Sequence, residues 1–153
     1  MSATRPRILL VASPGGHLQQ LLALEPAWRD LPRRWATLAS TDSRTLLEGE
    51  DVVLCHGPTH RNLRNAVRNL WLAWRTLRGF DADVVLSTGA ALAVPFFVVG
   101  RLTGRRCIYV ESLTRVEGLA LSGRLVYPLA DDFFVQWPTS STRRRARYAG
   151  SVL

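Results

Sequence analysis

Short, continuous apolar runs alternate with stretches of helical periodicity along most of the chain, and this alternation constrains the fold more than any other feature. Arg7–Ala12 reads RILLVA, and an uninterrupted apolar run of this length is typical of a strand buried on both faces. After Ser13–Gly16, leucines and a tryptophan recur at the spacing of an amphipathic helix. The alternation predicts βαβ units, and therefore an α/β fold with a Rossmann-like, doubly wound parallel sheet.

The later elements follow the same pattern. Further strands are predicted at 35–40, 51–55, 83–86, 106–110 and 132–136. Helices are predicted at 63–77, 90–102 and 121–129, with a helical turn at 43–48. A polar, basic stretch then interrupts the pattern, so we expect one domain over 1–138 and a basic linker with a C-terminal tail over 139–153.

The charge of the chain favours phosphate-bearing partners. Twenty basic residues, all arginine, face twelve acidic ones, which gives a net charge of +8. Such an excess suits nucleic acid, anionic lipid headgroups or a nucleotide or pyrophosphate substrate. The wide separation of Cys55 and Cys107 and the small number of histidines argue against a disulfide scaffold and against a structural zinc site. We expect no metal and no cofactor.

No segment has the length and composition of a transmembrane helix. The apolar run at the N-terminus, Ile8–Ala12, is too short to span a bilayer, and the longest apolar stretch, Val84–Gly100, contains Ser87, Thr88 and a proline. We therefore expect no transmembrane helix in this chain.

The first predicted strand ends in a loop with paired glycines and a histidine. Gly15 and Gly16 permit a tight turn, and the next helix directs unpaired N–H groups and its positive dipole end at the loop. A phosphate or pyrophosphate is the expected ligand, whereas the absence of GxGxxG disfavours a nicotinamide dinucleotide. His17 begins the helix, where the neutral imidazole is favoured and can take a proton from a hydroxyl. A turn without a ligand and a capping histidine are the alternatives.

A second loop of small residues follows the strand predicted at 83–86. Ser87, Thr88 and Gly89 offer hydroxyls and backbone amides to a phosphate or a sugar. The alternative is that Ser87 or Thr88 caps the following helix.

A third loop follows the strand predicted at 106–110. Glu111 can bond a substrate hydroxyl or act as a base, and Ser112 and Arg115 can bind a substrate, Arg115 through a phosphate. The alternative is an ion pair between Glu111 and Arg115. Because ligands bind at the carboxyl ends of parallel strands, we expect all three loops to lie at one edge of the sheet.

The helix predicted at 63–77 is basic and aromatic. Arg61–Gly79 carries five arginines, two tryptophans and no acid. An apolar stripe is expected along one face, formed by Leu63, Val67, Leu70, Trp74 and Leu77. Its flank is formed by Arg64, Arg68, Trp71, Arg75 and Arg78. Such a flank suits an anionic membrane surface, and the alternative is that the stripe packs on the sheet while the arginines face water.

The order and spacing of several short motifs resemble a known family. The motifs are Gly15–Leu18, the 64–74 helix, Ser87–Gly89, Val110–Ser112 with Arg115-Val116, Leu121–Leu125, Tyr127–Asp131, Phe134–Trp137 and Ala146–Gly150. In this order the chain resembles the acceptor-side subunits of split bacterial polysaccharide glycosyltransferases of the PssD type. It also resembles their eukaryotic relative, the membrane-anchoring subunit of the enzyme that adds the second N-acetylglucosamine to dolichol-pyrophosphate-GlcNAc.

The resemblance implies the N-terminal half of a GT-B glycosyltransferase, similar to the same half of MurG-type enzymes. This half would bind a polyprenyl-pyrophosphate-sugar acceptor, and a separate donor-binding subunit would bind the UDP-sugar in an inverting transfer. The chain would be inactive alone and peripheral at the cytoplasmic face of the membrane. The resemblance also implies that the C-terminal tail holds the partner, with Tyr148, Val152 and Leu153 as anchors. The alternative is that Val152 and Leu153 pack on their own domain.

Two functions from other classes stay open on the residues alone. A basic nucleic-acid-binding α/β module would fit the charge, although the sequence carries no recognisable nucleic-acid motif, so we expect no nucleic acid. A stand-alone nucleotide-dependent Rossmann enzyme is weakened by the missing dinucleotide fingerprint.

Overall fold

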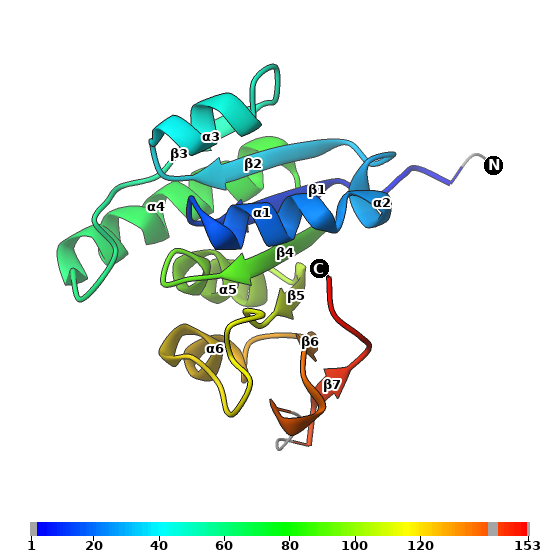
Figure 1. Cartoon of the computed structure of the whole chain (residues 1–153). Helices are drawn as coiled ribbons and strands as arrows, with labels where there is room; N and C mark the ends of the chain where they lie inside the picture. Colours follow the sequence, from blue (N-terminus) through cyan, green and yellow to red (C-terminus); the bar gives the residue numbers. More distant parts are fainter. Residues whose placement is uncertain (1–2, 141–143, 153) are drawn as a thin grey trace.

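The computed structural model describes residues 3–140 and 144–152, and it contains one parallel sheet covered by helices (Figure 1). The strands are β1 (Ile8–Ala12), β2 (Arg33–Thr37), β3 (Val52–Leu54), β4 (Val84–Gly89), β5 (Arg106–Val110), β6 (Asp132–Val135) and β7 (Ala146–Tyr148). The helices are α1 (Gly16–Ala23), α2 (Glu25–Trp28), α3 (Thr41–Leu46), α4 (Leu63–Phe80), α5 (Ala93–Leu102) and α6 (Leu121–Val126), and a 3₁₀ turn covers Pro138–Ser140. The predicted α/β class and parallel sheet are confirmed.

The strand order is β3-β2-β1-β4-β5-β6-β7, and every neighbouring pair is parallel. The order reverses between β1 and β4, because the chain builds outward from β1 to β3 and then returns to the other side of β1. A crevice for ligands forms at the carboxyl ends of the two strands on either side of such a reversal. The loops after β1 and β4 are therefore the first place to look for a site.

The continuous apolar run of β1 is buried on both faces, as the sequence predicts. Leu9 and Val11 belong to the core on the side of α4 and α5, and Leu10 belongs to the core on the side of α1 and α2. Figure 1 shows α1 and α2 together on one face of the sheet and α4 and α5 on the other. Side chains of a strand alternate between its two faces, so a strand covered by helices on both sides has no polar face.

The segment after residue 138 is more than a linker. Ala146–Tyr148 adds β7 to the edge of the sheet, in register with β6. The strand is short and basic, and Arg147 is bonded to the Asp132 carboxylate at 2.9 Å. The division of the chain at residue 138 stays a prediction, with the correction that β7 belongs to the same sheet.

The buried side of α4 differs from the expected apolar stripe. Leu77 is buried, but Leu63 and Val67 are exposed, and Asn65 and Asn69 face the interior instead. Asn69 exchanges two hydrogen bonds with the backbone of His56, at 2.8 and 2.9 Å. The two asparagines are buried because they satisfy the backbone of the segment between β3 and α4, which the helical periodicity does not reveal.

Candidate functional site

Two loops meet at the carboxyl ends of β1 and β4. The loop after β1 carries Gly15, Gly16 and His17, and the end of β4 carries Thr88 and Gly89. The Ser13 amide donates to the Gly89 carbonyl at 3.3 Å, so the loop after β1 is in direct backbone contact with the end of β4. The prediction that these residues share one edge of the sheet agrees with this geometry.

His17 is held by Thr88 through both its ring and its backbone. Nδ1 of His17 lies 2.9 Å from the carbonyl oxygen of Thr88, and the Thr88 hydroxyl donates to the His17 carbonyl at 2.5 Å. A carbonyl oxygen can only accept, so Nδ1 carries a proton, and in the neutral form of the ring Nε2 is then the nitrogen without one. The half-buried imidazole is therefore oriented as a proton acceptor.

Gly89 has no room for a side chain. Its φ is +115°, and a Cβ at this position would lie 2.8 Å from Nδ1 of His17 and 3.3 Å from the hydroxyl of Tyr109. Only glycine fits such a contact and such a backbone conformation. The residue lets the imidazole ring lie directly against the end of β4.

Tyr109 was not among the residues expected at the site. Its buried ring stacks on Phe133 with centroids 5.1 Å apart, and its hydroxyl lies 3.5 Å from that of Ser122. Burial raises the pKa of Tyr109, so the phenol keeps its proton. The feature of the sequence that could have indicated Tyr109 is a single hydroxyl group within the apolar strand at 106–110.

The hydroxyls of Ser87 and Thr88 are fully buried and bond within the protein. Ser87 Oγ accepts from the Gly89 amide at 3.1 Å, and the Thr88 hydroxyl is bonded to His17. Ser87–Gly89 lie within β4, whereas the sequence predicts a loop there. The Thr88 hydroxyl ties the end of β4 to the start of α1, and the Ser87 hydroxyl bonds within the strand.

The glycine loop itself faces open space. Gly15 has a φ of +86°, and a Cβ added to Gly15 or to Gly16 would meet no heavy atom within 4 Å. Gly15 stands at the N-cap of α1 with no side-chain cap, and the first N–H groups of a helix have no partner within it. The loop therefore offers backbone N–H groups and an unobstructed approach.

The third loop, after β5, encloses Glu111. The side chain is 1% exposed, and its carboxylate accepts from the amides of Ser112 at 2.9 Å and Ala120 at 3.0 Å. A Cβ on Gly123 would lie 2.1 Å from a carboxylate oxygen, so α6 can approach only because residue 123 is glycine. Ser112 is also buried, while Arg115 is exposed on the loop. The carboxylate therefore joins the loop to the start of α6.

The family model described as "Oligosaccharide biosynthesis protein Alg14 like" matches residues 34–152. The chain belongs to this Alg14-like family. The UDP-N-acetylglucosamine transferase subunit ALG14 of Eremothecium gossypii is 39% identical over 118 residues, covering 71% of this chain and 53% of that protein. The subunit of the same name from Homo sapiens is 28% identical over 179 residues, and the match covers 95% of this chain and 82% of the human protein. The chain thus spans about half the length of the Eremothecium relative.

Solved structures with the same fold are about twice as long. MurG of Acinetobacter baumannii superposes with a TM-score of 0.79 at 15% identity, covering 94% of this chain and 45% of MurG. The UDP-GlcNAc 2-epimerase of Methanocaldococcus jannaschii, in complex with UDP-GlcNAc and UDP, has a TM-score of 0.74 at 10% identity and is covered to 46%. The fold of the Alg14-like chain therefore corresponds to one half of the GT-B fold, as expected. The PssD-type side of the resemblance stays a prediction.

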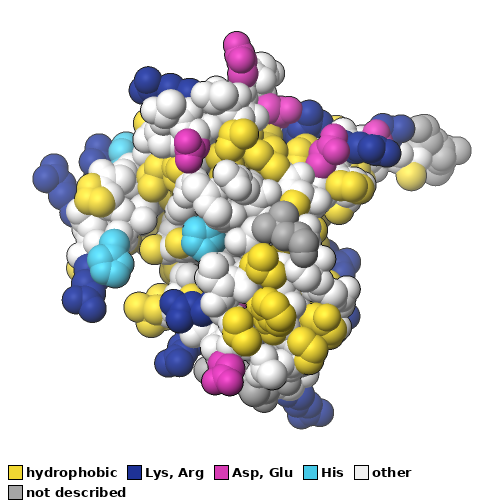
Figure 2. Space-filling view, in the orientation of Figure 1, with side chains coloured by type: hydrophobic (Ala, Val, Ile, Leu, Met, Phe, Trp, Pro, Cys, Tyr) yellow, Lys and Arg dark blue, Asp and Glu magenta, His cyan; other side chains and the backbone are white. Residues whose placement is uncertain are grey.

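The exposed face of α4 in this Alg14-like chain combines apolar and basic side chains. Leu63 is 80% exposed, Trp71 is 65% exposed, and Val67 lies between them. Among the residues that the structure describes, no acid forms an ion pair with Arg64, Arg68 or Arg75. In Figure 2, yellow and dark blue side chains lie side by side at the left, where α4 begins in Figure 1.

An apolar groove opens on the sheet face that carries α1 and α2. It has a volume of about 640 Å³ and a floor that includes Val84, Ile108 and Phe134, all half-buried. Its walls are α1 and α2 on one side and the tail, residues 149–152, on the other. Tyr148 is exposed and the half-buried Val152 lines the groove, while Leu153 lies outside the described residues. The sequence predicted an apolar tail but not the groove, because the groove depends on how far α1 and α2 extend over the sheet.

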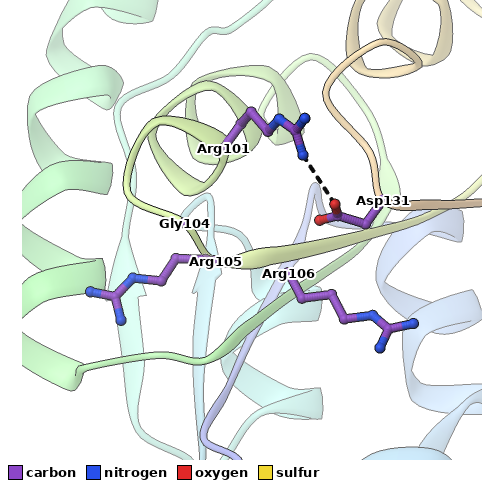
Figure 3. A pocket seen from close by; sticks show the side chains of 5 residues that line it. All are labelled: Arg101, Gly104, Arg105, Arg106 and Asp131. Carbon is purple, nitrogen blue, oxygen red and sulfur yellow. Dashed lines mark hydrogen bonds and ion pairs between the residues drawn. The ribbon is translucent and has the colours of Figure 1, made fainter.

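A second cavity, of about 350 Å³, lies at the opposite, amino-terminal end of the strands (Figure 3). Arg101 pairs with Asp131 at 3.1 Å, and Arg105 pairs with Asp81 at 3.1 Å. Arg106 also lines the cavity and pairs with Asp132. Since each arginine already faces an aspartate, this cavity has little excess charge for an anionic ligand.

The described residues contain no cluster of three or more potential metal ligands, and no helix in 3–140 or 144–152 is long and apolar enough to cross a membrane.

Cys55 and Cys107 are free thiols, and burial raises the pKa of each to about 12. Thiols with such a pKa are poor nucleophiles near neutral pH.

Proposed function

We propose that this chain is the acceptor-side subunit of a two-component, inverting glycosyltransferase. The pair would transfer N-acetylglucosamine or another hexose from a UDP-sugar to a polyprenyl-pyrophosphate-linked sugar. The observation that carries the proposal is His17, held with an unprotonated Nε2 beside an open glycine loop at the reversal point of the sheet. The names of the family and of its relatives support the same reaction class.

In the proposed reaction His17 is the general base. Its Nε2 takes the proton of the acceptor hydroxyl while the hydroxyl oxygen forms a bond to the anomeric carbon. The bond between that carbon and the UDP oxygen breaks, and UDP leaves with the electron pair. Attack from the face opposite to UDP inverts the anomeric centre.

We assign the acceptor pyrophosphate to the start of α1. Gly15 and Gly16 leave the approach open, and the helix N-terminus supplies N–H groups and positive potential. Arg115, exposed on the third loop, is a second group for a phosphate oxygen. Glu111, because its carboxylate is enclosed by backbone amides, is assigned to shaping this loop, and Ser112 to supporting it.

The donor half would come from another polypeptide. The relatives of this chain are named as subunits of a UDP-N-acetylglucosamine transferase, which supports a second polypeptide. We place the partner on the groove and the tail, with Tyr148, Val152 and Leu153 as contacts, because the groove leaves apolar side chains of β4, β5 and β6 accessible.

Membrane attachment is assigned to the exposed face of α4. Trp71 and Leu63 would enter the headgroup region while Arg64, Arg68 and Arg75 meet lipid phosphates. This would hold the subunit peripherally at the cytoplasmic face, next to a lipid-linked acceptor.

The test is reconstitution. The chain is purified alone and together with the co-expressed donor-binding subunit, and radiolabelled UDP-N-acetylglucosamine is offered with a polyprenyl-pyrophosphate-GlcNAc acceptor. We expect transfer by the pair and none by the chain alone. Robust transfer by the isolated chain would contradict the two-component proposal, and a pair active without a lipid-linked acceptor would contradict the assigned substrate.

The docking proposal has its own test. Deleting residues 149–153 should abolish co-purification with the donor-binding subunit and leave the thermal unfolding midpoint of the chain within a few degrees, since the deletion spares β7. A truncated chain that still binds its partner normally would move the interface elsewhere.

A further inference from the structure

Two buried glutamines connect three segments that are distant in sequence. Gln20 lies in α1, three residues after His17, and Gln136 follows β6; their side chains are 5% and 3% exposed. Their amide groups contact each other, the third loop and the C-terminal tail. Neither residue has a role in the function proposed above.

The hydrogen bonds define which way the Gln136 amide points. Its nitrogen donates to Oε1 of Gln20 at 2.6 Å and to the carbonyl oxygen of Glu111 at 2.9 Å. Its oxygen accepts from the backbone amide of Val152 at 3.1 Å. Because only the NH₂ group can donate to a carbonyl and only the oxygen can accept from an amide, the orientation is fixed by its neighbours.

Gln20 continues the connection into the third loop. Its Oε1 also accepts from the amide of Leu113 at 3.0 Å. One buried network therefore joins the tail, the helix that carries His17 and the loop that carries Arg115. Networks of this kind act as units when fully satisfied, because a buried polar group left unpaired is unfavourable.

We propose that Gln136 is a positioning residue that couples the C-terminal tail to the acceptor side of the site. The coupling to a partner rests on the proposed function, in which the tail contacts the donor-binding subunit. When the tail is held in place, Val152 holds the Gln136 amide, and Gln136 in turn holds the third loop against α1. Docking of the partner then orders the loop that receives the acceptor.

The experiment measures amide hydrogen exchange of the isolated full chain by mass spectrometry, in peptides that cover 111–120 and 148–153. Val152→Pro removes the Val152 N–H that donates to Gln136, and Val152→Ala keeps that N–H as the matched control. Gln136→Met removes both the N–H donors and the oxygen acceptor of the amide and keeps a side chain of similar size. Trp137→Phe removes a separate bond from the Trp137 indole to the Leu113 carbonyl, which does not involve the tail.

We expect Val152→Pro and Gln136→Met to raise exchange in 111–120 by about two- to tenfold, the range of one lost hydrogen bond. Val152→Ala should leave it unchanged, and Trp137→Phe should loosen the loop without loosening the tail. If Val152→Pro affects only the tail while 111–120 exchanges as before, the coupling is overturned, whatever happens to overall stability. If Val152→Ala equals Val152→Pro, the effect comes from packing and the coupling is also overturned.

A second readout uses the two-subunit enzyme. Gln136→Met should raise KM for the lipid-linked acceptor several-fold and leave KM for the UDP-sugar unchanged, a split that a general loss of folded protein would not produce. An equal change in both KM values would overturn the coupling. Absence of transfer by the unaltered pair would instead count against the proposed function, and the exchange experiment would still decide the role of Gln136.

Discussion

Two groups of arginines, one at the amino-terminal end of the sheet and one on α4, differ in their surroundings. Arg101, Arg105 and Arg106 each pair with an aspartate, and Figure 3 shows the pair between Arg101 and Asp131. The α4 arginines stand among exposed apolar side chains, without acidic partners in the part of the chain that the structure describes. The α4 arginines therefore form a local concentration of positive charge, which favours a surface for anions at that helix.

The carboxyl end of the sheet differs from both arginine regions. Its key contact joins Nδ1 of His17 to the Thr88 carbonyl and leaves Nε2, the other ring nitrogen, available. We therefore expect residues at the carboxyl ends of the strands to determine activity, and residues at the amino-terminal ends to contribute to stability. Four sets of substitutions test this expectation.

The largest effect is expected for His17→Ala in the two-subunit enzyme. Loss of a general base should lower kcat by about 10²- to 10⁴-fold. The unfolding midpoint should change little, because the ring is only half-buried. Steady-state transfer kinetics and thermal unfolding measure the two quantities, and an unchanged kcat would require another base.

Gly89→Ala should lower kcat by about 100-fold, since the new methyl group displaces the ring of His17 and small misplacements have effects of this size. Gly104→Ala is the matched control at the other end of the sheet. Gly104 also has a positive φ, of +74°, but a Cβ there meets nothing within 4 Å. Both variants should lose some stability, and only Gly89→Ala should lose activity. Equal activities of the two variants would contradict the role of Gly89 in positioning His17.

Replacing Arg64, Arg68 and Arg75 together with Gln should weaken binding to anionic vesicles by about 100-fold at low salt, at about 1 kcal/mol for each arginine near the surface. The same substitutions at Arg101, Arg105 and Arg106 remove equal charge and serve as the control. Vesicle co-sedimentation should show a much smaller loss for the control. Equal losses would mean that net charge, rather than the α4 face, determines membrane affinity.

The smallest effect is expected for Asp132→Asn. Asp132 accepts from Arg106 at 2.8 Å and from Arg147 at 2.9 Å, so it ties β5 and β7 to β6. Because both arginines are largely exposed, the unfolding midpoint should fall by only a few degrees while kcat stays the same. Asp30→Asn, at an exposed pair 4.0 Å apart, is the control and should have no measurable effect.

The fold was predictable from the sequence because six of the seven strands are continuous apolar runs or end in small-residue loops. β7 was not, since Ala146-Arg147-Tyr148 is held at the edge by an ion pair with a residue of another strand. The buried side of α4 was also not predictable, because Asn69 is buried by bonds to His56, thirteen residues earlier in the chain.

The candidate site was predictable in its location and less so in its contacts. Glycines beside His17 indicated a ligand loop, and the parallel topology brought the β4 end to it. The inward bonds of Ser87 and Thr88, the fit of Gly89 against the imidazole and the two-glutamine network depend on three-dimensional neighbours that no local pattern encodes.

The groove beside the tail has a consequence for handling the protein in solution. Half-buried Val84, Ile108 and Phe134 form an apolar floor that another molecule of the same chain can also contact. Mutual repulsion between molecules of net charge +8 opposes such association, and added salt screens that repulsion. The isolated chain should therefore become more prone to precipitate as ionic strength rises, and co-expression with a subunit that fills the groove should remove that dependence.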